Sequence, residues 1–319
     1  MMERCLIRGG RAVPSDSGLR PAVVVNSTRV RDLARLRREF EQHAAASGWR
    51  SPLVLATTPD EPGAGLTRRA LESGASLVIA VGGDGTVSAC ASALAGTGVP
   101  LAIIPAGSAN LTAHALGVPR RPGPALRVAF GGQDRLIDLG SADGTVFTAM
   151  AGIGLDAAVV AAARGLGKRL AGWPAYAAAA TGQLLRPPSG FTIRLDDGEP
   201  LERQARSVTV GNSGRLPGGF AIMPDARLDD GRLDVVILAP AGPLGWADVG
   251  YRVATGSRRD DSRLERFQAT TVEVRASGSA LSRQVDGEIV APADVLSVRV
   301  LPRALLVRAP AAARHRDGS

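Results

Sequence analysis

Residues Ser76–Gly96, SLVIAVGGDGTVSACASALAG, decide the fold of this chain. A continuous apolar run ends at Val81, three glycines surround one carboxylate, and a helical pattern begins near Val87, with Thr86 placed to cap it. Continuous apolar strands are typical of a parallel sheet covered on both faces, and ligands bind such sheets beyond the carboxyl ends of the strands. The stretch therefore predicts a strand, a ligand-binding loop over residues 82–86, and a helix.

The same alternation flanks this unit. Apolar strands are predicted in PAVVVN, SPLVLATT and PLAIIPAG, with helical patterns between them. After Gln133 short strand patterns dominate, with one helical insertion expected over residues 156–185, which favours an antiparallel sandwich or barrel. The expected organisation is a flexible leader (1–20), an α/β nucleotide-binding domain (21–133), a mainly β domain whose last segment could return to the first (134–310), and a flexible tail (311–319).

Composition limits the class of partner. The 319 residues are 45% hydrophobic and carry a net charge of +8, which favours anionic partners such as nucleotides or membrane surfaces. Aromatic residues are only 3% of the chain, so nucleic acid is not expected as a partner. No apolar run reaches the ~20 residues needed to span a bilayer, and the N-terminus has no signal-peptide pattern. We expect a cytoplasmic protein, soluble or peripheral at the inner membrane face.

The glycine-rich loop indicates phosphoryl transfer. Main-chain amides at the start of a helix bind phosphate, and Asp84 within the loop is intelligible if the ligand is a nucleotide polyphosphate that carries Mg²⁺. The Walker sequence is absent, so a nucleotide site here is of another kind. A tight turn with Asp84 as an ordinary turn residue is the alternative.

A second polar loop follows the next strand in PAGSAN, where Ser108 and Asn110 could face the same cleft as Asp84. Hydroxyl and amide side chains also follow the first two strands, in Asn26–Thr28 and at Thr57 and Thr58. Because the carboxyl ends of parallel strands share one edge of a sheet, these loops are expected to meet. A simple helix cap formed by Ser108 and Asn110 is the alternative.

These motifs resemble the diacylglycerol kinase catalytic-domain family, which includes bacterial lipid kinases and sphingosine kinases. GGDGT is followed by PAGSANLTAHALG, and later by AGIGLDAAVV, GNSGRLPGGFAIMPDARLDDGRLDVVIL and QVDGE, so the likeness spans residues 22–310. The resemblance implies an N-terminal domain like those of NAD kinases and phosphofructokinases, a C-terminal antiparallel β-sandwich, and an active site in the cleft between them. It also implies ATP and Mg²⁺ as co-substrates and a lipid with a free hydroxyl as acceptor.

The resemblance assigns roles to particular residues. It implies Glu288 as the general base, supported by Asp286, with Asp84 in the catalytic loop, and a Mg²⁺ site made by Asp230 and the carbonyls of Arg227 and Arg232. Exposed acidic turns are the alternative for both acidic segments. With Asn110 from the second loop, the expected nucleotide-binding residues are Asn26, Thr28, Thr58, Gly82, Gly83, Asp84, Gly85, Thr86, Ser108 and Asn110.

The chain departs from the family pattern after the fourth strand. Where many members read Gly-Thr-x-Asn-Asp-Phe-Ala-Arg, this sequence has Leu111 and His114 in place of the acid and the arginine. A catalytically silent nucleotide- or lipid-binding protein is therefore one alternative. An NAD kinase is another, although its second glycine- and threonine-rich signature is missing. The arginine-rich segment 251–267 either contacts anionic lipid head groups or is neutralised by its own acids, Asp260, Asp261 and Glu265.

Overall fold

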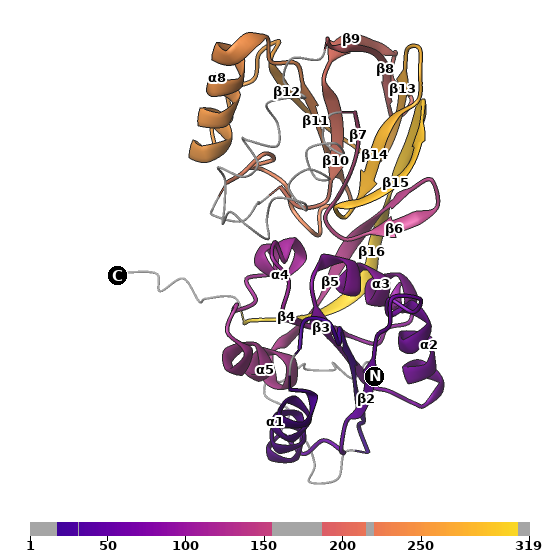
Figure 1. Cartoon of the computed structure of the whole chain (residues 1–319), viewed down its shortest axis with the longest axis vertical. Coiled ribbons are helices and arrows are strands. Elements are labelled where there is room, and N and C mark those ends of the chain that lie inside the picture. The colour runs from indigo at the N-terminus through magenta and orange to yellow at the C-terminus, as the bar shows by residue number, and fades with distance from the viewer. Residues whose placement is uncertain (1–17, 31, 155–186, 215–219, 312–319) are drawn as a thin grey trace, which may run out of the picture.

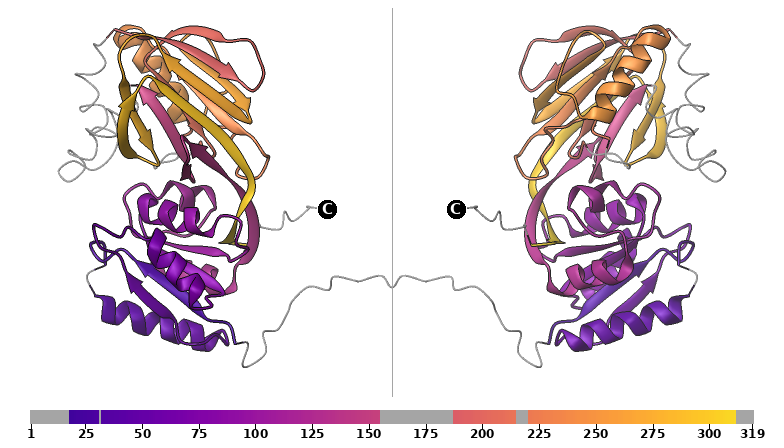
Figure 2. Two further views of the ribbon diagram at one scale, coloured as in Figure 1. Left: turned by 90° about the vertical axis from the view of Figure 1, so that its right-hand side faces the viewer. Right: turned by 90° about the vertical axis from the view of Figure 1, so that its left-hand side faces the viewer.

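The computed structural model describes residues 18–30, 32–154, 187–214 and 220–311, and the helical insertion predicted over 156–185 lies outside them. The described chain forms two halves, one above the other (Figures 1 and 2). Among the described residues, no helix is both long and apolar enough to cross a membrane.

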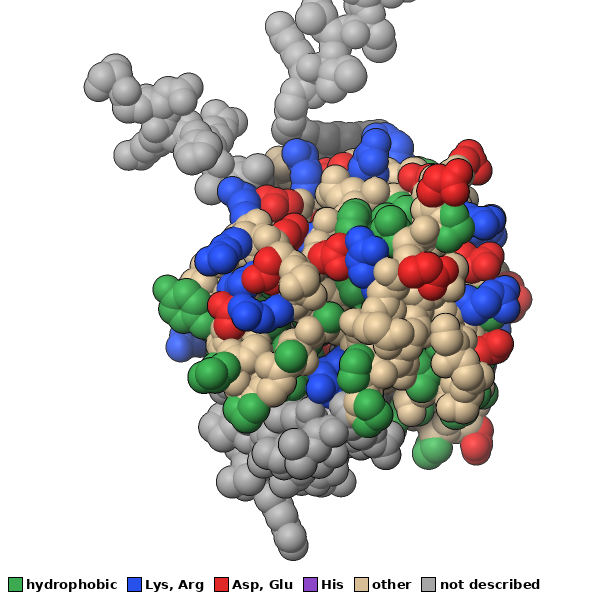
Figure 3. All heavy atoms as spheres, turned by 90° about the horizontal axis from the view of Figure 1, so that it is seen from above, with side chains coloured by type: hydrophobic (Ala, Val, Ile, Leu, Met, Phe, Trp, Pro, Cys, Tyr) green, Lys and Arg blue, Asp and Glu red, His purple; other side chains and the backbone are tan. Residues whose placement is uncertain are grey.

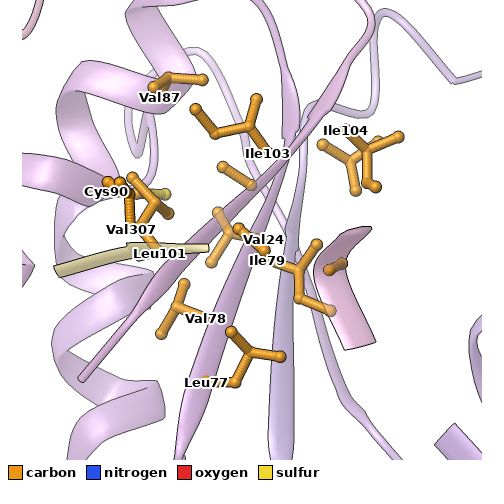
Figure 4. Packing of buried hydrophobic residues seen from close by; sticks show 14 of the residues in the cluster. Val24, Leu77, Val78, Ile79, Val87, Cys90, Leu101, Ile103, Ile104 and Val307 are labelled. Atoms are coloured by element: carbon orange, nitrogen blue, oxygen red, sulfur yellow. The ribbon is translucent and has the colours of Figure 1, made fainter. Parts of the chain in front are cut away.

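The N-terminal half is built on four parallel strands in the order β2, β1, β3, β4. Their side chains are largely buried, and Figure 4 shows Val24, Ile79 and Ile103 packed together in this core. Such burial on both faces explains the uninterrupted apolar sequence of β1, β3 and β4. The elements are β1 (Pro21–Val25), α1 (Leu33–Ala46), β2 (Leu53–Ala56), α2 (Ala64–Glu72), β3 (Leu77–Gly82), α3 (Asp84–Leu94), β4 (Leu101–Pro105), α4 (Leu111–Ala115) and α5 (Pro122–Gly131).

Two long strands join the halves. Strand β5 (Gln133–Ala142) pairs antiparallel with β16 (Val295–Ala309), and β16 also pairs parallel with β4 through Val307 and Leu101. The sheet then continues through β13 (Thr271–Ala276) and β8 (Ser189–Leu195) to β9 (Leu201–Ala205), while β6 (Thr145–Phe147) pairs with β5. One ten-stranded sheet therefore runs from the N-terminal half into the C-terminal β-sandwich, hereafter the β half (Figure 1).

A second sheet completes the sandwich. Its six strands are antiparallel, and buried residues such as Phe191, Val210 and Val274 fill the core that it shares with the first sheet. Helix α8 (Gly242–Thr255) packs on the other face of this sheet through Val249 and Val253. In sheet order the strands are β12 (Leu264–Ala269), β11 (Leu233–Leu238), β10 (Ser207–Gly211), β7 (Met150–Gly154), β14 (Leu281–Val285) and β15 (Glu288–Ala293).

This architecture confirms the predicted fold class, an α/β half followed by an antiparallel β-sandwich. The sequence analysis missed α5 and α8. Helix α8 begins Gly-Pro and contains Gly245 and Gly250, which are poor helix formers, so tertiary packing rather than local propensity stabilises it. The predicted domain boundaries stay a prediction.

Candidate active site

Four loops that follow the parallel strands lie side by side, in the order of the strands. The Ser27 hydroxyl donates to the carbonyl oxygen of Thr57 at 2.9 Å, and the Asn26 amide Nδ2 donates to the Thr86 hydroxyl at 3.3 Å. Ala106, in the fourth loop, donates its main-chain N–H to the carbonyl oxygen of Gly82 at 2.8 Å. The structure thus brings together loops that the sequence analysis placed around one nucleotide.

Two members of this predicted set make only local contacts. Thr28 donates both its N–H and its hydroxyl to Oδ1 of Asn26, at 3.1 and 2.7 Å. Thr58, after the edge strand β2, exchanges main-chain hydrogen bonds with Glu61. Ser108 is exposed at the tip of the fourth loop. All three side chains therefore belong to the rim of the loop cluster.

The glycine loop turns directly into α3. Gly83 is the N-cap residue and Asp84 the first helical residue, so the prediction that Thr86 caps this helix is wrong. Thr86 lies inside the first turn and is buried, with its hydroxyl accepting from Asn26. Because Gly83 has no side chain, the N-cap residue makes no hydrogen bond to the first main-chain N–H groups of α3. A phosphate-binding site needs such N–H groups.

The glycine loop and the fourth loop touch main chain to main chain. A β-carbon built on Gly107 would lie 2.5 Å from the Cα of Gly83 and 2.8 Å from Oδ1 of Asn110. Gly83 and Gly107 therefore allow the two loops to pack closely, in addition to any part they have in binding phosphate.

Replacing Gly107 by alanine is expected to reduce the free energy of unfolding by about 1–3 kcal/mol, because neither backbone can move away cheaply. Urea unfolding followed by circular dichroism measures the change. Gly123→Ala is the matched control, since its β-carbon meets no atom within 4 Å. Equal stability of the Gly107 variant and the wild type would contradict the close packing.

Asp84 joins these two loops through its carboxylate. Oδ1 accepts from the N–H of Leu111 at 2.6 Å, and Oδ2 accepts from the N–H of Asn110 at 2.9 Å. Asn110 has φ 52° and secures the turn by bonding Gly107 through both ends of its side-chain amide. Burial, and then the charge of Asp286, raise the pKa of Asp84 above its ordinary value. The carboxylate therefore holds the fourth loop against the glycine loop.

Asp286, in the β half, also binds main-chain N–H groups through its carboxylate. Its buried carboxylate accepts from the N–H and hydroxyl of Thr148, at 2.8 and 3.0 Å, and from the N–H groups of Ala149 and Met150, at 2.8 and 3.0 Å. The residue has φ 47°, and its own N–H donates to the Met150 carbonyl at 2.8 Å. These contacts hold the turn that leads into β15.

Glu288, the first residue of β15, lies against the glycine loop. A β-carbon built on Gly85 would stand 2.9 Å from Oε1 of Glu288, so the carboxylate reaches the first turn of α3. The sequence separates these two residues widely, and only the fold brings them together. The predicted base is thus at the loop where a phosphate would bind.

Comparison with known proteins agrees with this geometry. Residues 20–142 match the family model of the diacylglycerol kinase catalytic domain, and residues 149–309 match the YegS C-terminal NAD kinase beta sandwich-like domain. A probable lipid kinase YegS-like from Pseudomonas aeruginosa is 33% identical over 273 residues, which cover 81% of this chain and 84% of the relative. The chain belongs to the diacylglycerol kinase catalytic-domain family.

One further relative supports this membership, and one solved structure shares the fold. A diacylglycerol kinase from Mycobacterium tuberculosis is 29% identical over 256 residues, which cover 77% of this chain and 80% of that protein. The crystal structure of a putative diacylglycerol kinase from Bacillus anthracis superposes with a TM-score of 0.74, covering 92% of this chain and 98% of that one. At 22% identity the superposition shows that the fold is shared.

Where many members of the diacylglycerol kinase family have an acid after this asparagine, Leu111 is in apolar contact. Leu111 packs against Ala149 and Met150, the residues whose amides bind Asp286. Beside it the hydroxyls of Thr112 and Thr148 lie 2.7 Å apart, both fully buried. The second departure, His114, is exposed. Leu111 therefore contributes to the contact between the halves, and the sequence analysis did not identify Thr112 or Thr148.

The turn predicted to bind Mg²⁺ is tied to β5. Oδ2 of Asp138, a fully buried residue, accepts from the N–H of Gly231 at 2.6 Å, and its Oδ1 accepts from the N–H of Arg303 at 2.7 Å. The predicted ligand Asp230 accepts from the N–H of Arg232 at 3.0 Å. Sequence analysis missed Asp138, whose apolar strand context carries no signal for a polar role.

Next to this turn the structure gathers carboxylates. Asp234 is buried and its Oδ2 has no hydrogen-bond partner among the described residues. Burial raises the pKa of Asp234 to about 6, and it outweighs the hydrogen bond from Gln268, which lowers the pKa; the charges of Asp230 and Asp225 add smaller upward effects. Within the described ranges no group of three or more His, Cys, Asp or Glu side chains is arranged to hold a metal. The unpaired Oδ2 of Asp234 nevertheless lies near a second acid, Asp230. Such an arrangement is compatible with a cation held by one carboxylate and main-chain carbonyls.

The raised pKa of Asp234 has a measurable consequence. The folded protein holds this proton more tightly than the unfolded chain, so stability is expected to fall as the pH rises from about 4 to about 6. Asp234→Asn is expected to flatten that slope and to raise the free energy of unfolding at pH 7 by about 1–3 kcal/mol. Urea titrations across this pH range, without added metal, measure both effects. An unchanged slope in the variant would contradict the assignment.

The arginine-rich segment 251–267, which begins in the last turns of α8, is paired with acids. Arg252 is buried and contacts Asp248 at 2.5 Å and Asp261 at 2.7 Å, and Arg266 contacts Asp260 at 2.5 Å. Glu265, also expected to serve this segment, pairs instead with Arg203. Figure 3, which looks onto this end of the molecule, shows basic and acidic side chains interspersed. The internal-partner interpretation accounts for these arginines, and contact with anionic lipid stays a prediction.

Proposed function

We propose that this protein is an ATP- and Mg²⁺-dependent lipid kinase that phosphorylates a hydroxyl of diacylglycerol or a related lipid. The observation that carries the proposal is the Glu288 carboxylate lying against Gly85, in a loop of the kind that binds phosphate. Membership of the diacylglycerol kinase family and the names of the relatives support the same reaction class.

ATP would bind along the loops that follow the parallel strands. The amides at the start of α3 would receive phosphate oxygens, with the remaining hydroxyls and amides around them. The nucleotide-binding set is Asn26, Thr28, Thr58, Gly82, Gly83, Asp84, Gly85, Thr86, Ser108 and Asn110.

Glu288 would accept the proton of the acceptor hydroxyl. That oxygen forms a bond to the γ-phosphorus as the bond between the γ-phosphorus and the bridging oxygen breaks, and ADP leaves with the electron pair. Asp84 and Asp286 serve differently in this proposal, because main-chain amides already occupy both oxygens of each carboxylate. They position the loops and the Glu288 turn.

The turn at Asp230 would hold Mg²⁺ with the carbonyls of Arg227 and Arg232. A divalent ion bound there would supply positive charge beside Asp230 and Asp234, and would keep the turn in one conformation. Asp138 of β5, which accepts from the Gly231 N–H, would fix the position of this turn relative to β5. We further expect a cytoplasmic protein that meets its lipid at the inner membrane surface.

The test is transfer of labelled γ-phosphate from ATP to lipids in mixed micelles, with and without Mg²⁺. The proposal expects a labelled phospholipid that depends on Mg²⁺. ATP binding without transfer to any hydroxyl lipid would favour the catalytically silent alternative, for which Leu111 and His114 are the motivation. Labelling of NAD instead would favour the NAD kinase alternative.

A further inference from the structure

Helix α8 presents a row of uncharged side chains to solvent. Leu244 is 86% exposed and Tyr251 is 69% exposed, and they are the two most exposed large hydrophobic residues of the described chain. Residues at this spacing lie on one face of a helix. Ala247 and Ala254 fall on the same face and are exposed as well. We call these four residues, Leu244, Ala247, Tyr251 and Ala254, the α8 ridge.

The two charged residues of α8 lie beside this ridge and neutralise each other. The helix contains one acid, Asp248, and one base, Arg252, and these pair at 2.5 Å. Arg252 is buried, on the side of α8 that packs on the sheet through Val249 and Val253. A surface helix normally presents charged or polar side chains to water. A solvent face whose large side chains are apolar therefore indicates a partner.

Exposed arginines follow the ridge directly. Arg258 and Arg259 come just after Gly256, which caps the C-terminus of α8, and both are exposed. Arg258 contacts Asp225 at 2.7 Å, but both side chains are more than half exposed, and such surface pairs are weak. The side chain of Arg259 has no hydrogen bond or ion pair with any residue that the structure describes. Both cations are therefore available to an anionic partner.

The C-terminal end of α8 also contacts the segment that leads to the predicted Mg²⁺ turn. The carbonyl oxygen of Val253 accepts from the N–H of Ala221 at 2.9 Å. Asp225, the partner of Arg258, lies between Ala221 and the turn at Asp230 in the sequence. Figure 1 shows α8 along the outside of the β half. A short stretch of chain therefore joins the ridge to the candidate active site.

The area and the charge of the ridge favour a bilayer over a second protein chain. Leu244 and Tyr251 together expose on the order of 300 Å², whereas a stable protein interface buries about 800 Å² on each partner. A bilayer requires less: leucine enters the acyl-chain boundary, tyrosine lies at the head groups, and arginine contacts lipid phosphates. Figure 3 shows hydrophobic and basic side chains near each other on the side of the molecule where α8 lies.

We propose that the α8 ridge docks this protein on an anionic bilayer, with Leu244 at the acyl-chain boundary and Tyr251 among the head groups. Arg258 and Arg259 contact lipid phosphates. The inference rests on the proposed lipid kinase function, since a kinase whose acceptor lies in a membrane has to reach its surface. Apolar insertion carries much of the binding, because most arginines of segment 251–267 are already paired with acids.

Sedimentation with vesicles, without ATP or acceptor lipid, tests the ridge. The vesicles are phosphatidylcholine alone or phosphatidylcholine mixed with anionic phosphatidylglycerol. Replacing Leu244 and Tyr251 together by serine is expected to lower the partition coefficient on the anionic vesicles about tenfold or more, because both apolar side chains leave the interface. Leu33→Ser is the matched control: this exposed leucine begins α1 in the N-terminal half, and its replacement should leave binding unchanged.

Replacing Arg258 and Arg259 together by glutamine tests the electrostatic part. Binding to the anionic vesicles is expected to weaken about fivefold per arginine, while binding to neutral vesicles changes little. The matched control replaces Arg35 and Arg37 by glutamine, since these arginines of α1 are also exposed and also pair with acids. All of these side chains lie largely in solvent, so the melting temperatures of the variants should stay close to that of the wild type.

Kinase assays separate docking from catalysis. Transfer to a short-chain, water-soluble diacylglycerol should be the same for the wild type and for the variant with serine at 244 and 251. Transfer to long-chain diacylglycerol in the anionic vesicles should fall with the partition coefficient. Ridge-dependent vesicle binding without transfer to any lipid overturns the kinase proposal and leaves the docking surface standing.

Three results overturn the docking inference while the kinase stands. The first is wild-type protein that binds neither kind of vesicle but transfers phosphate to lipid in mixed micelles. The second is equal vesicle binding by the wild type and the serine variant. The third is a dimer in sedimentation velocity that the serine variant dissociates, because that result assigns the ridge to a second copy of the chain.

Discussion

Replacing Glu288 by glutamine is expected to lower phosphoryl transfer to lipid by about 10²–10⁴-fold, the usual contribution of a positioned general base. Glutamine has nearly the same shape, so it can occupy the space above Gly85, but it cannot accept the proton of the acceptor hydroxyl. ATP affinity and thermal stability should change little. Initial rates in mixed micelles, with calorimetric titration of ATP, measure both properties.

Two companion variants make this result specific. Glu273→Gln alters a glutamate on β13 that pairs with Arg275, and it should leave transfer unchanged. Gly85→Ala keeps the carboxylate but introduces a β-carbon 2.9 Å from Oε1, so it should slow transfer by displacing Glu288. If the Glu288→Gln enzyme retains most of its rate, the base is another group.

Replacing Asp286 by alanine is expected to lower the free energy of unfolding by about 3–5 kcal/mol. Three buried main-chain N–H groups and the Thr148 hydroxyl lose their acceptor together, in a region where Thr148 and Ala149 are fully buried. Transfer should also fall at temperatures where the variant is folded, because the turn no longer places Glu288. Urea unfolding and kinase assays on the same preparation test both effects.

Asp196 provides the matched control for this variant. It has φ 51°, close to the φ 47° of Asp286, and its carboxylate also accepts from two N–H groups and two hydroxyls, those of Thr270 and Thr271. Asp196 is exposed, so water can replace its bonds and Asp196→Ala should cost about 1 kcal/mol, with no loss of transfer. Equal destabilisation by the two variants would show that burial of the Asp286 cluster is unimportant.

Much of the fold could be predicted because the burial pattern of several strands is visible directly in their sequences. Strands β1, β3 and β4 are buried throughout and read as unbroken apolar runs, whereas β13 alternates buried and exposed residues. Strand β15 shows neither pattern, because most of its residues are exposed, and it was missed. Helix α5 was missed for a different reason: it opens Pro-Gly-Pro, which reads as a loop.

The candidate site could be predicted only where glycines or acids mark it. The glycine loop was visible in the sequence, and Glu288 followed from a resemblance, but the contact between them depends on the pairing of distant strands. The groups that hold the loops together could not be found. Asp138, Thr112 and Thr148 are isolated polar residues in apolar segments, and their importance lies in complete burial beside main-chain amides.

The path of β16 imposes an order on synthesis. Strand β4 receives its neighbour from residues 295–309, after all the other strands of both sheets, so a nascent polypeptide exposes that edge until those strands have been made (Figure 1). An open parallel edge is a site for pairing with other chains. The N-terminal half therefore cannot complete its sheet before β16 has been synthesised, and we expect pairing of β16 with β4 to protect that edge from aggregation.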